Sequence, residues 1–225
     1  MKILAIVPTQ DEFHYFLQAC LEKSYQADTA FTGKLPVTHF PALGIAVACG
    51  GLGKTQFAVQ TQHLIDLAHW DWVICAGAAG ALVESISVGD VVVATETVEH
   101  DIRNKFGKPM LPRFGGAKTI LEHCHQTLPA SSAFKVHFGC VASGDEDVVE
   151  SERRKALHLQ TGALAVAWEG AGGARACQFS DVPYLEVRGV SDSANGKAAL
   201  DYEKNLPLVM SNVARVVLSW VRNPL

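Results

Sequence analysis

The chain has 225 residues, a formal net charge of −4 and 48% apolar residues. This length fits one domain of ordinary size, and the apolar share is enough for a sizeable core, so we expect a single domain over residues 1–225. The weak negative charge and the lack of a long basic run disfavour nucleic acid and anionic membrane surfaces as partners.

The sequence carries no pattern typical of secretion or membrane insertion. Residues 1–7 form a short apolar run without the basic start and long apolar core of a signal peptide, and no run reaches bilayer-spanning length. The six cysteines are scattered without a C-x-x-C pair, which favours buried thiols over disulfides. We therefore expect a cytoplasmic protein that makes no contact with a membrane.

The first half of the chain alternates apolar runs with amphipathic stretches. Helices are predicted at about residues 12–23 and, after three closely spaced glycines, at 56–67. The small residues 77–81 are predicted to form a loop that another backbone or a ligand can approach closely. The irregular stretch 99–116 is predicted to be a functional loop, at an oligomer contact or over a site. Strands are predicted at residues 2–7, 36–40, 43–49, 72–75 and 91–94.

The second half continues the alternation. Strands are predicted at residues 135–142, 164–167 and 184–187. Helices are predicted at residues 117–128, 149–159, 169–179 and 208–221. Alternating strands and helices are typical of a layered α/β domain with a largely parallel sheet.

Residues 187–195 read as the end of a buried strand followed by small and polar residues. Open α/β sheets place their ligands at the carboxyl ends of their strands, so Asp192 is a candidate functional carboxyl group. An Asp after a strand more often caps the next helix, and the spacing alone favours that second interpretation.

Two local motifs point to chemistry that the rest of the sequence does not support. Residues 48–55 nearly match a P-loop, but Ala48 stands where the first glycine is required. His123, Cys124 and His125 are consecutive on a predicted helix, so their side chains point in different directions and cannot converge on one ion. We expect no metal and no cofactor.

Three carboxyl groups are each predicted at a strand end: Glu12, Glu169 and Asp192. Taken singly, each is more often a helix cap or a surface charge. At one edge of one sheet they would form an acidic pocket without a metal, suited to acid/base chemistry on a neutral or cationic substrate. Partial burial would raise the pKa of such a carboxyl group, as a general acid at neutral pH requires.

Six motifs in order resemble the purine nucleoside phosphorylase and nucleosidase superfamily, and within it the 5'-methylthioadenosine/S-adenosylhomocysteine nucleosidases. The motifs are M-K-I-L-A-I-V with Glu12 following, G-L-G-K at 51–54, A-G-A-A-G-A-L with V-G-D-V-V-V within 76–93, V-A-S-G-D at 141–145, A-L-A-V-A-W-E-G-A at 163–171 and V-P-Y-L-E-V-R-G-V-S-D at 182–192. The resemblance implies a three-layer sandwich with a central mixed, largely parallel sheet flanked by helices.

The resemblance also implies a mechanism. Asp192 would protonate or hydrogen-bond N7 of an adenine-like base, so that the purine leaves as a neutral group. Glu12 would polarise a water for attack at the anomeric carbon, with Arg188 helping to place it, and Glu169 would accept hydrogen bonds from the ribose hydroxyls. The remaining residues expected at the substrate are Trp168, Val148, Ala78, Gly80 and Ser191.

Several positions depart from the family pattern. Trp168 stands where the family has a methionine, and Ala167 stands where it has a second glutamate. Asp147 replaces an aromatic residue that stacks on adenine, and Ala78 replaces a serine. Residues 8–10 replace small residues and methionine near the 5' group. The resemblance therefore implies the reaction class but leaves open what fills the 5' pocket.

Hydrolysis of an adenosine-type nucleoside is the favoured function. The alternatives are a phosphate-dependent purine nucleoside phosphorylase or futalosine-type hydrolase of the same fold, and a non-catalytic nucleoside-binding protein. Phosphorolysis is disfavoured because the first loop offers Thr9 but no arginine, and Glu12 would repel the anion. The resemblance further implies a homo-oligomer, with a dimer expected.

Overall fold

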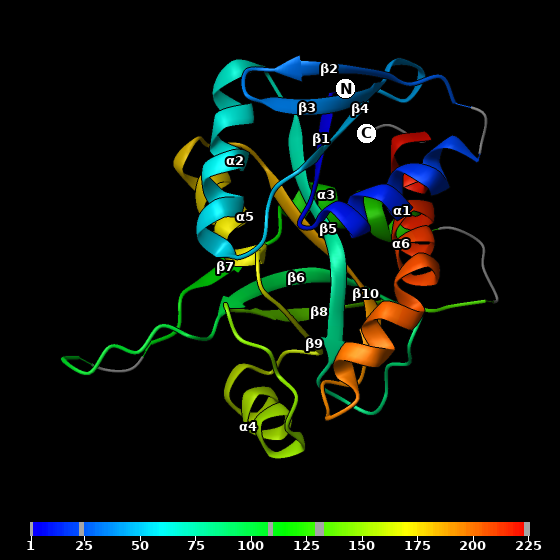
Figure 1. Cartoon of the computed structure of the whole chain (residues 1–225). Coiled ribbons are helices and arrows are strands. Elements are labelled where there is room, and N and C mark those ends of the chain that lie inside the picture. Colours follow the sequence, from blue (N-terminus) through cyan, green and yellow to red (C-terminus); the bar gives the residue numbers. More distant parts are fainter. Residues whose placement is uncertain (1, 23–24, 108–109, 129–132, 223–225) are drawn as a thin grey trace.

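The strands and helices alternate along the chain as expected. The computed structural model describes residues 2–22, 25–107, 110–128 and 133–222 (Figure 1). Its strands are Ile3–Val7 (β1), Asp28–Thr32 (β2), Leu35–Phe40 (β3), Ile45–Cys49 (β4), Trp72–Ala81 (β5), Val91–Glu99 (β6), Arg113–Gly115 (β7), Val136–Ser143 (β8), Ala165–Ala167 (β9) and Tyr184–Asp192 (β10). Its helices are Gln10–Leu21 (α1), the 3-10 turn Pro41–Leu43 (η1), Lys54–Leu67 (α2), Lys118–Gln126 (α3), Ser151–Thr161 (α4), Gly170–Phe179 (α5) and Ala198–Arg222 (α6).

The strands form one mixed sheet organised around β5. Strands β4, β1, β5 and β10 are parallel neighbours, and β3 and β2 extend the β4 edge in antiparallel fashion. On the other side, β10 pairs with β6, β6 with β8 and β8 with β9, which returns to pair with the end of β5. Strand β5 is therefore bordered along its whole length, and all ten of its residues are buried.

Helices cover both faces of this sheet, which confirms the predicted three-layer α/β fold. Along β1, Ile3, Ala5 and Val7 pack in one cluster with α1, α3 and α6, while Leu4 and Ile6 pack in another with α2 and α5. This alternation follows from the two-residue period of a strand. Figure 1 shows α1 and α6 on one side of the sheet and α2 and α5 on the other.

Several predictions were wrong in part. Strand β2 was not predicted, and the stretch 99–116, expected to be irregular, contains β7, which pairs with β6. Residues 77–81 were expected to form a loop, but they continue β5, because β10 and β9 supply partners for their backbone groups. The last helix was expected from residue 208, after Pro207, but α6 starts at Ala198 and includes Pro207. Burial of Leu206, one residue before the proline, anchors this part of the helix in the core.

Within the described part of the chain, none of the helices combines the length and apolar character needed to cross a membrane.

Candidate active site

Glu12 lies in the first turn of α1, directly after β1. Thr9 caps this helix: its hydroxyl accepts from the Glu12 N–H (3.2 Å), and Glu12 Oε2 accepts from the Thr9 N–H (3.0 Å) and hydroxyl (2.8 Å). This capping box follows from the T-x-x-E sequence. The other oxygen, Oε1, accepts from the Ala78 N–H at 2.7 Å, so the cap also holds the buried carboxylate against β5.

Arg188 is buried in the middle of β10. Within the described residues it is the only cation that forms an ion pair with Glu169 or Glu186. Its Nε donates to Glu186 Oε1 at 2.8 Å, and its Nη1 donates to the Ala78 carbonyl at 3.3 Å. Its Nη2 lies 3.3 Å from Cys75 Sγ and 3.4 Å from Glu169 Oε2. Arg188 thus connects two carboxyl groups: that of Glu186 on β10 and that of Glu169, the residue before α5.

Glu169 lies between β9 and α5 and is buried. Its Oε1 accepts from the Gly53 N–H at 3.2 Å, in the turn before α2. Burial raises the pKa of Glu169 to about 7; Arg188 and the Gly53 N–H act in the lowering direction, and the nearby Glu12 in the raising one. Glu169 therefore titrates near neutral pH.

Gly77 provides the space in which these groups meet. A Cβ at this position would lie 2.6 Å from Arg188 Nη1 and 3.0 Å from both Glu12 Oε1 and Pro8 Cδ. No side chain fits there without displacing the guanidinium or the carboxylate. The glycine in β5 is consequently part of the site architecture, although its side chain contributes no chemical group.

Asp192 is the last residue of β10 and pairs with Gly80 of β5. Its Oδ2 accepts from the Ser191 hydroxyl at 2.7 Å and its Oδ1 from the Ala194 N–H at 2.8 Å. Burial raises the pKa of Asp192, while these two hydrogen bonds act in the opposite direction. Because α6 begins only at Ala198, Asp192 does not cap that helix, and the capping interpretation was wrong.

The two halves of the site lie next to each other along β5. Ala78 contacts both Glu12 and Arg188, and a Cβ at Gly80 would lie 2.8 Å from Asp192 Oδ1. Two residues of a strand span about 7 Å. Glu12, Glu169 and Arg188 therefore form one cluster, and Asp192 lies beside it, one strand repeat further along β5.

The other expected contact residues surround these groups. Half-buried Trp168 precedes Glu169, and its carbonyl accepts from the Ser143 hydroxyl at 2.6 Å. Val148 is buried in a small apolar cluster with Ala194, next to Asp192. These positions place Trp168 on the Glu169 side of the site and Val148 on the Asp192 side.

The near-P-loop holds a carboxylate of the protein itself. Gly51 and Gly53 have φ values of +83° and +82°, which glycine adopts without strain, and the Gly53 N–H points at Glu169. The Lys54 ammonium is paired with Glu99 and Asp101. The lysine that would bind phosphates in a P-loop is thus neutralised by two carboxylates.

The H-C-H residues of α3 have separate surroundings. His123 Nε2 lies 3.3 Å from the Trp220 carbonyl, Cys124 is buried, and His125 stacks on Phe138 with ring centres 3.5 Å apart. Among the residues that the structure describes, no group of three or more His, Cys, Asp or Glu side chains is placed to hold a metal ion.

Two residues of the cluster were not predicted, Thr9 as the cap of Glu12 and Glu186 as the partner of Arg188. The sequence carries a signal for each. Thr9 begins a capping-box pattern that ends at Glu12. Glu186 is a charged residue in an apolar strand, two positions before Arg188 and therefore on the same face.

Comparison with known proteins identifies the family. A sequence profile described as "Phosphorylase superfamily" matches residues 2–222. The chain belongs to this superfamily. The match confirms the resemblance that the six motifs indicated.

Individual members of the phosphorylase superfamily resemble the chain over most of its length. The 5'-methylthioadenosine/S-adenosylhomocysteine nucleosidase of Exiguobacterium sp. is 31% identical over 183 residues, which cover 78% of each chain. The crystal structure of the Neisseria meningitidis nucleosidase with methylthio-immucillin-A has a TM-score of 0.86 at 28% identity and covers 97% of this chain and 98% of its own. The Colwellia psychrerythraea nucleosidase in complex with adenine has a TM-score of 0.85 at 25% identity and covers 99% of this chain and 95% of its own.

Proposed function

We propose that residues 1–225 form one domain that hydrolyses the N-glycosidic bond of an adenosine-type nucleoside of the 5'-methylthioadenosine/S-adenosylhomocysteine class. The observation that carries the proposal is the buried arrangement of Glu12, Glu169 and Arg188 beside Asp192. The relatives named as nucleosidases, one of them bound to adenine, support the same reaction and base.

Asp192 acts on the purine in this mechanism. Burial raises its pKa, which favours the protonated carboxylic acid that a general acid needs. Ser191 lies 2.7 Å from one carboxyl oxygen and fixes its orientation. A proton delivered to N7 lets the base leave as a neutral molecule, which lowers the barrier to cleavage of the glycosidic bond.

Glu12, Arg188 and Glu169 act on water and sugar. Glu12 is held by Thr9 and Ala78 and accepts a proton from the attacking water, which Arg188 helps to place. Glu169 in its ionised form accepts hydrogen bonds from the ribose hydroxyls and stabilises the positive charge that develops on the sugar.

The charge of the site favours water over phosphate as the nucleophile. Three carboxyl groups, those of Glu12, Glu169 and Glu186, surround Arg188, whose guanidinium already contacts two of them. An incoming phosphate anion would be repelled by these groups. A phosphorylase would need a cationic site that is free to bind the anion.

Incubating the purified protein with adenosine-type nucleosides, with and without phosphate, tests this reaction. We expect release of free base and free ribose sugar at a rate independent of phosphate. Phosphate-dependent formation of ribose 1-phosphate would reject hydrolysis. Tight nucleoside binding without release of any base over a long incubation would favour the binding-protein alternative. A panel that varies the 5' substituent identifies the substrate.

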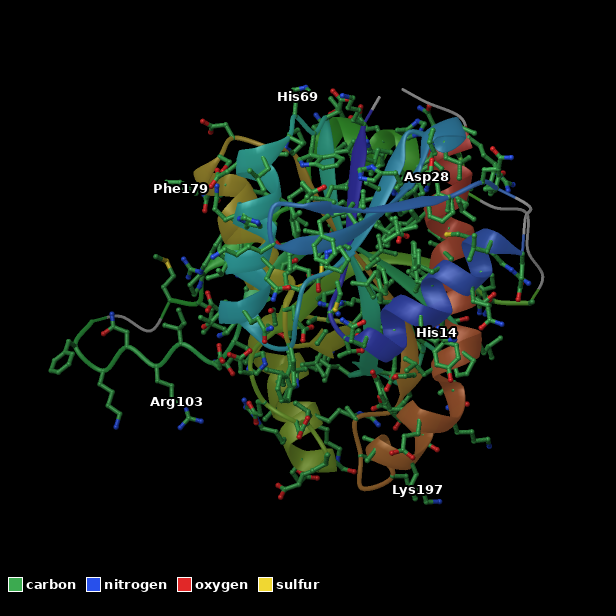
Figure 2. All side chains as sticks on the ribbon, turned by 45° about the horizontal axis from the view of Figure 1, so that its top comes forward. His14, Asp28, His69, Arg103, Phe179 and Lys197 are labelled. Atoms are coloured by element: carbon green, nitrogen blue, oxygen red, sulfur yellow. The ribbon has the colours of Figure 1, made fainter. Side chains whose placement is uncertain are left out.

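We further propose that the protein is a homodimer. Large apolar side chains are exposed in or next to α2, at the end of α5 and in the segment between β6 and β7: Leu52, Val59, Phe106, Met110 and Phe179. Figure 1 shows α2, α5 and the projecting segment between β6 and β7 on one side of the molecule, and Figure 2 shows Phe179 and Arg103 there. A second copy that packs on these elements would bury the five side chains.

Light scattering after size-exclusion chromatography tests the dimer. The double variant Phe106→Ser, Phe179→Ser is expected to shift the mass toward the monomer. The matched control is Leu159→Ser, which removes an exposed apolar side chain from α4. A monomeric wild-type protein, or equal dissociation in the control, would reject the proposed interface.

A further inference from the structure

Glu186 makes the shortest contact of Arg188. Its side chain has no exposed surface, and its Oε1 accepts from Arg188 Nε at 2.8 Å. The other contacts of the guanidinium, with Ala78, Cys75 and Glu169, are 3.3 to 3.4 Å long. A long side chain buried in a strand needs at least one strong partner to hold a single orientation, and for Arg188 that partner is Glu186.

Two other elements hold the Glu186 carboxylate in place. Thr97 of β6 donates its hydroxyl to Glu186 Oε2. Gly170, the first residue of α5, leaves the necessary room, because a Cβ there would lie only 2.2 to 2.3 Å from all three carboxylate atoms. The pocket for this carboxylate is therefore built by β6, α5 and β10 together.

We propose that Glu186 is a positioning residue for Arg188: it fixes the guanidinium through Nε, leaves Nη1 and Nη2 directed at Ala78 and Glu169, and offsets part of its positive charge. This inference rests on the proposed nucleosidase function and adds to it a residue that does not touch the substrate.

Arg188 contacts both Glu186 and Glu169, so the proposed charge effect of Glu186 on Glu169 acts at this shared guanidinium. The groups facing Arg188 are Glu186, Glu169, Glu12 and Cys75. Burial raises the pKa of Cys75, so this thiol stays neutral near pH 7.

The remaining neighbours of Glu186 carry no charge that would alter this balance. Burial raises the pKa of Tyr184 well above its usual value and that of Cys140 to about 12, so both stay neutral. Removing the negative charge of Glu186 leaves the attraction of Arg188 for Glu169 uncompensated, which favours the ionised form of Glu169.

The decisive experiment compares the pH profile of kcat/KM in wild type, Glu186→Gln and Glu186→Asp. Glutamine keeps an oxygen that accepts from Arg188 Nε but carries no charge. We expect its acid limb to move down by about one pH unit, with kcat at the optimum reduced less than about tenfold. Aspartate keeps the charge but is too short for the Nε contact. We expect its acid limb to stay in place while kcat falls by about tenfold or more.

The matched control is Asp90→Asn, which neutralises a buried carboxylate that accepts from Ser87, Lys135 and His137, away from Arg188. Its acid limb should coincide with that of wild type. An unmoved acid limb in Glu186→Gln, or an equal shift in Asp90→Asn, would overturn the inference. If Glu186→Gln does not fold, wild-type kcat in Glu186→Asp would overturn it by itself.

A second readout separates this inference from the proposed function. The carboxyl carbon of Glu169 can be titrated by carbon-13 NMR without any substrate. Failure of the wild-type protein to release base would reject the nucleosidase function. The Glu169 titration would still decide the role of Glu186, because an equal pKa in wild type and Glu186→Gln contradicts the charge effect.

Discussion

The buried Glu169 should make the stability of the folded protein fall as the pH rises. Burial raises the pKa of this carboxyl group from 4.5 to about 7. Between these two pH values the unfolded chain has lost the proton, whereas the folded protein still holds it. Since the unfolded state binds fewer protons in this window, the free energy of unfolding decreases with increasing pH. Glu169→Gln removes this effect because an amide is uncharged at every pH.

The size of the effect follows from the pKa shift. One pKa unit corresponds to about 1.4 kcal/mol, so a shift from 4.5 to about 7 destabilises the folded state by about 3 kcal/mol above pH 7. Most of this change falls between pH 5 and pH 8. Relative to wild type, Glu169→Gln should therefore gain about 2 to 3 kcal/mol in unfolding free energy over that range.

Urea unfolding of both proteins at pH 5, 6, 7 and 8 measures this difference. Contributions of titrating groups far from Glu169 are shared by both proteins and cancel in the comparison. Glu152→Gln is the control, because Glu152 lies exposed on α4 and its removal should leave the pH dependence unchanged. Curves for wild type and Glu169→Gln that stay parallel within about 0.5 kcal/mol would refute the reasoning.

Three further substitutions test the geometry of the site. Asp192→Asn should lower turnover by at least about a hundredfold in a folded protein, as loss of a general acid does, and near-normal activity would remove Asp192 from the mechanism. Gly77→Ala should destabilise the protein by about 1 to 3 kcal/mol and lower kcat more than tenfold, because the new Cβ displaces Arg188 or Glu12; wild-type activity would contradict the close contact. Arg188→Lys keeps the charge but loses the Nε contact to Glu186, so kcat should fall by more than about tenfold, which steady-state assays measure.

Where local chemistry determines the backbone, the sequence was sufficient to predict the structure. The apolar run at residues 2–7 predicted β1 and placed Glu12 directly after it. The T-x-x-E pattern, which sets the start of α1 at Gln10, was not recognised. The strand ends that carry Glu169 and Asp192 were also predicted, because alternating strands and helices leave few alternatives. Motif order then indicated the superfamily.

The errors came from residues whose conformation is set by distant partners. Residues 77–81 are glycine and alanine, which have little preference for a strand, and only the pairing with β10 and β9 makes them one. The sequence marks Glu186 as a charged residue on the same strand face as Arg188, but its contact with Thr97 and its close approach to Gly170 are visible only in the structure. No local pattern encodes that arrangement of three elements.

The small residues of the site serve the three carboxyl groups through their backbone. The N–H of Ala78 donates to Glu12, that of Gly53 to Glu169, and that of Ala194 to Asp192. A backbone N–H stabilises a carboxylate without carrying a full charge, so the carboxyl groups stay buried and available to the substrate. Arg188 lowers the pKa of Glu169, but the effect of burial is larger, so the pKa of Glu169 is still raised. Burial also raises the pKa of Asp192. The N–H groups of Gly53 and Ala194 therefore oppose the rise in pKa that burial causes in Glu169 and Asp192, while Gly77 leaves the space in which Glu12 and Arg188 meet.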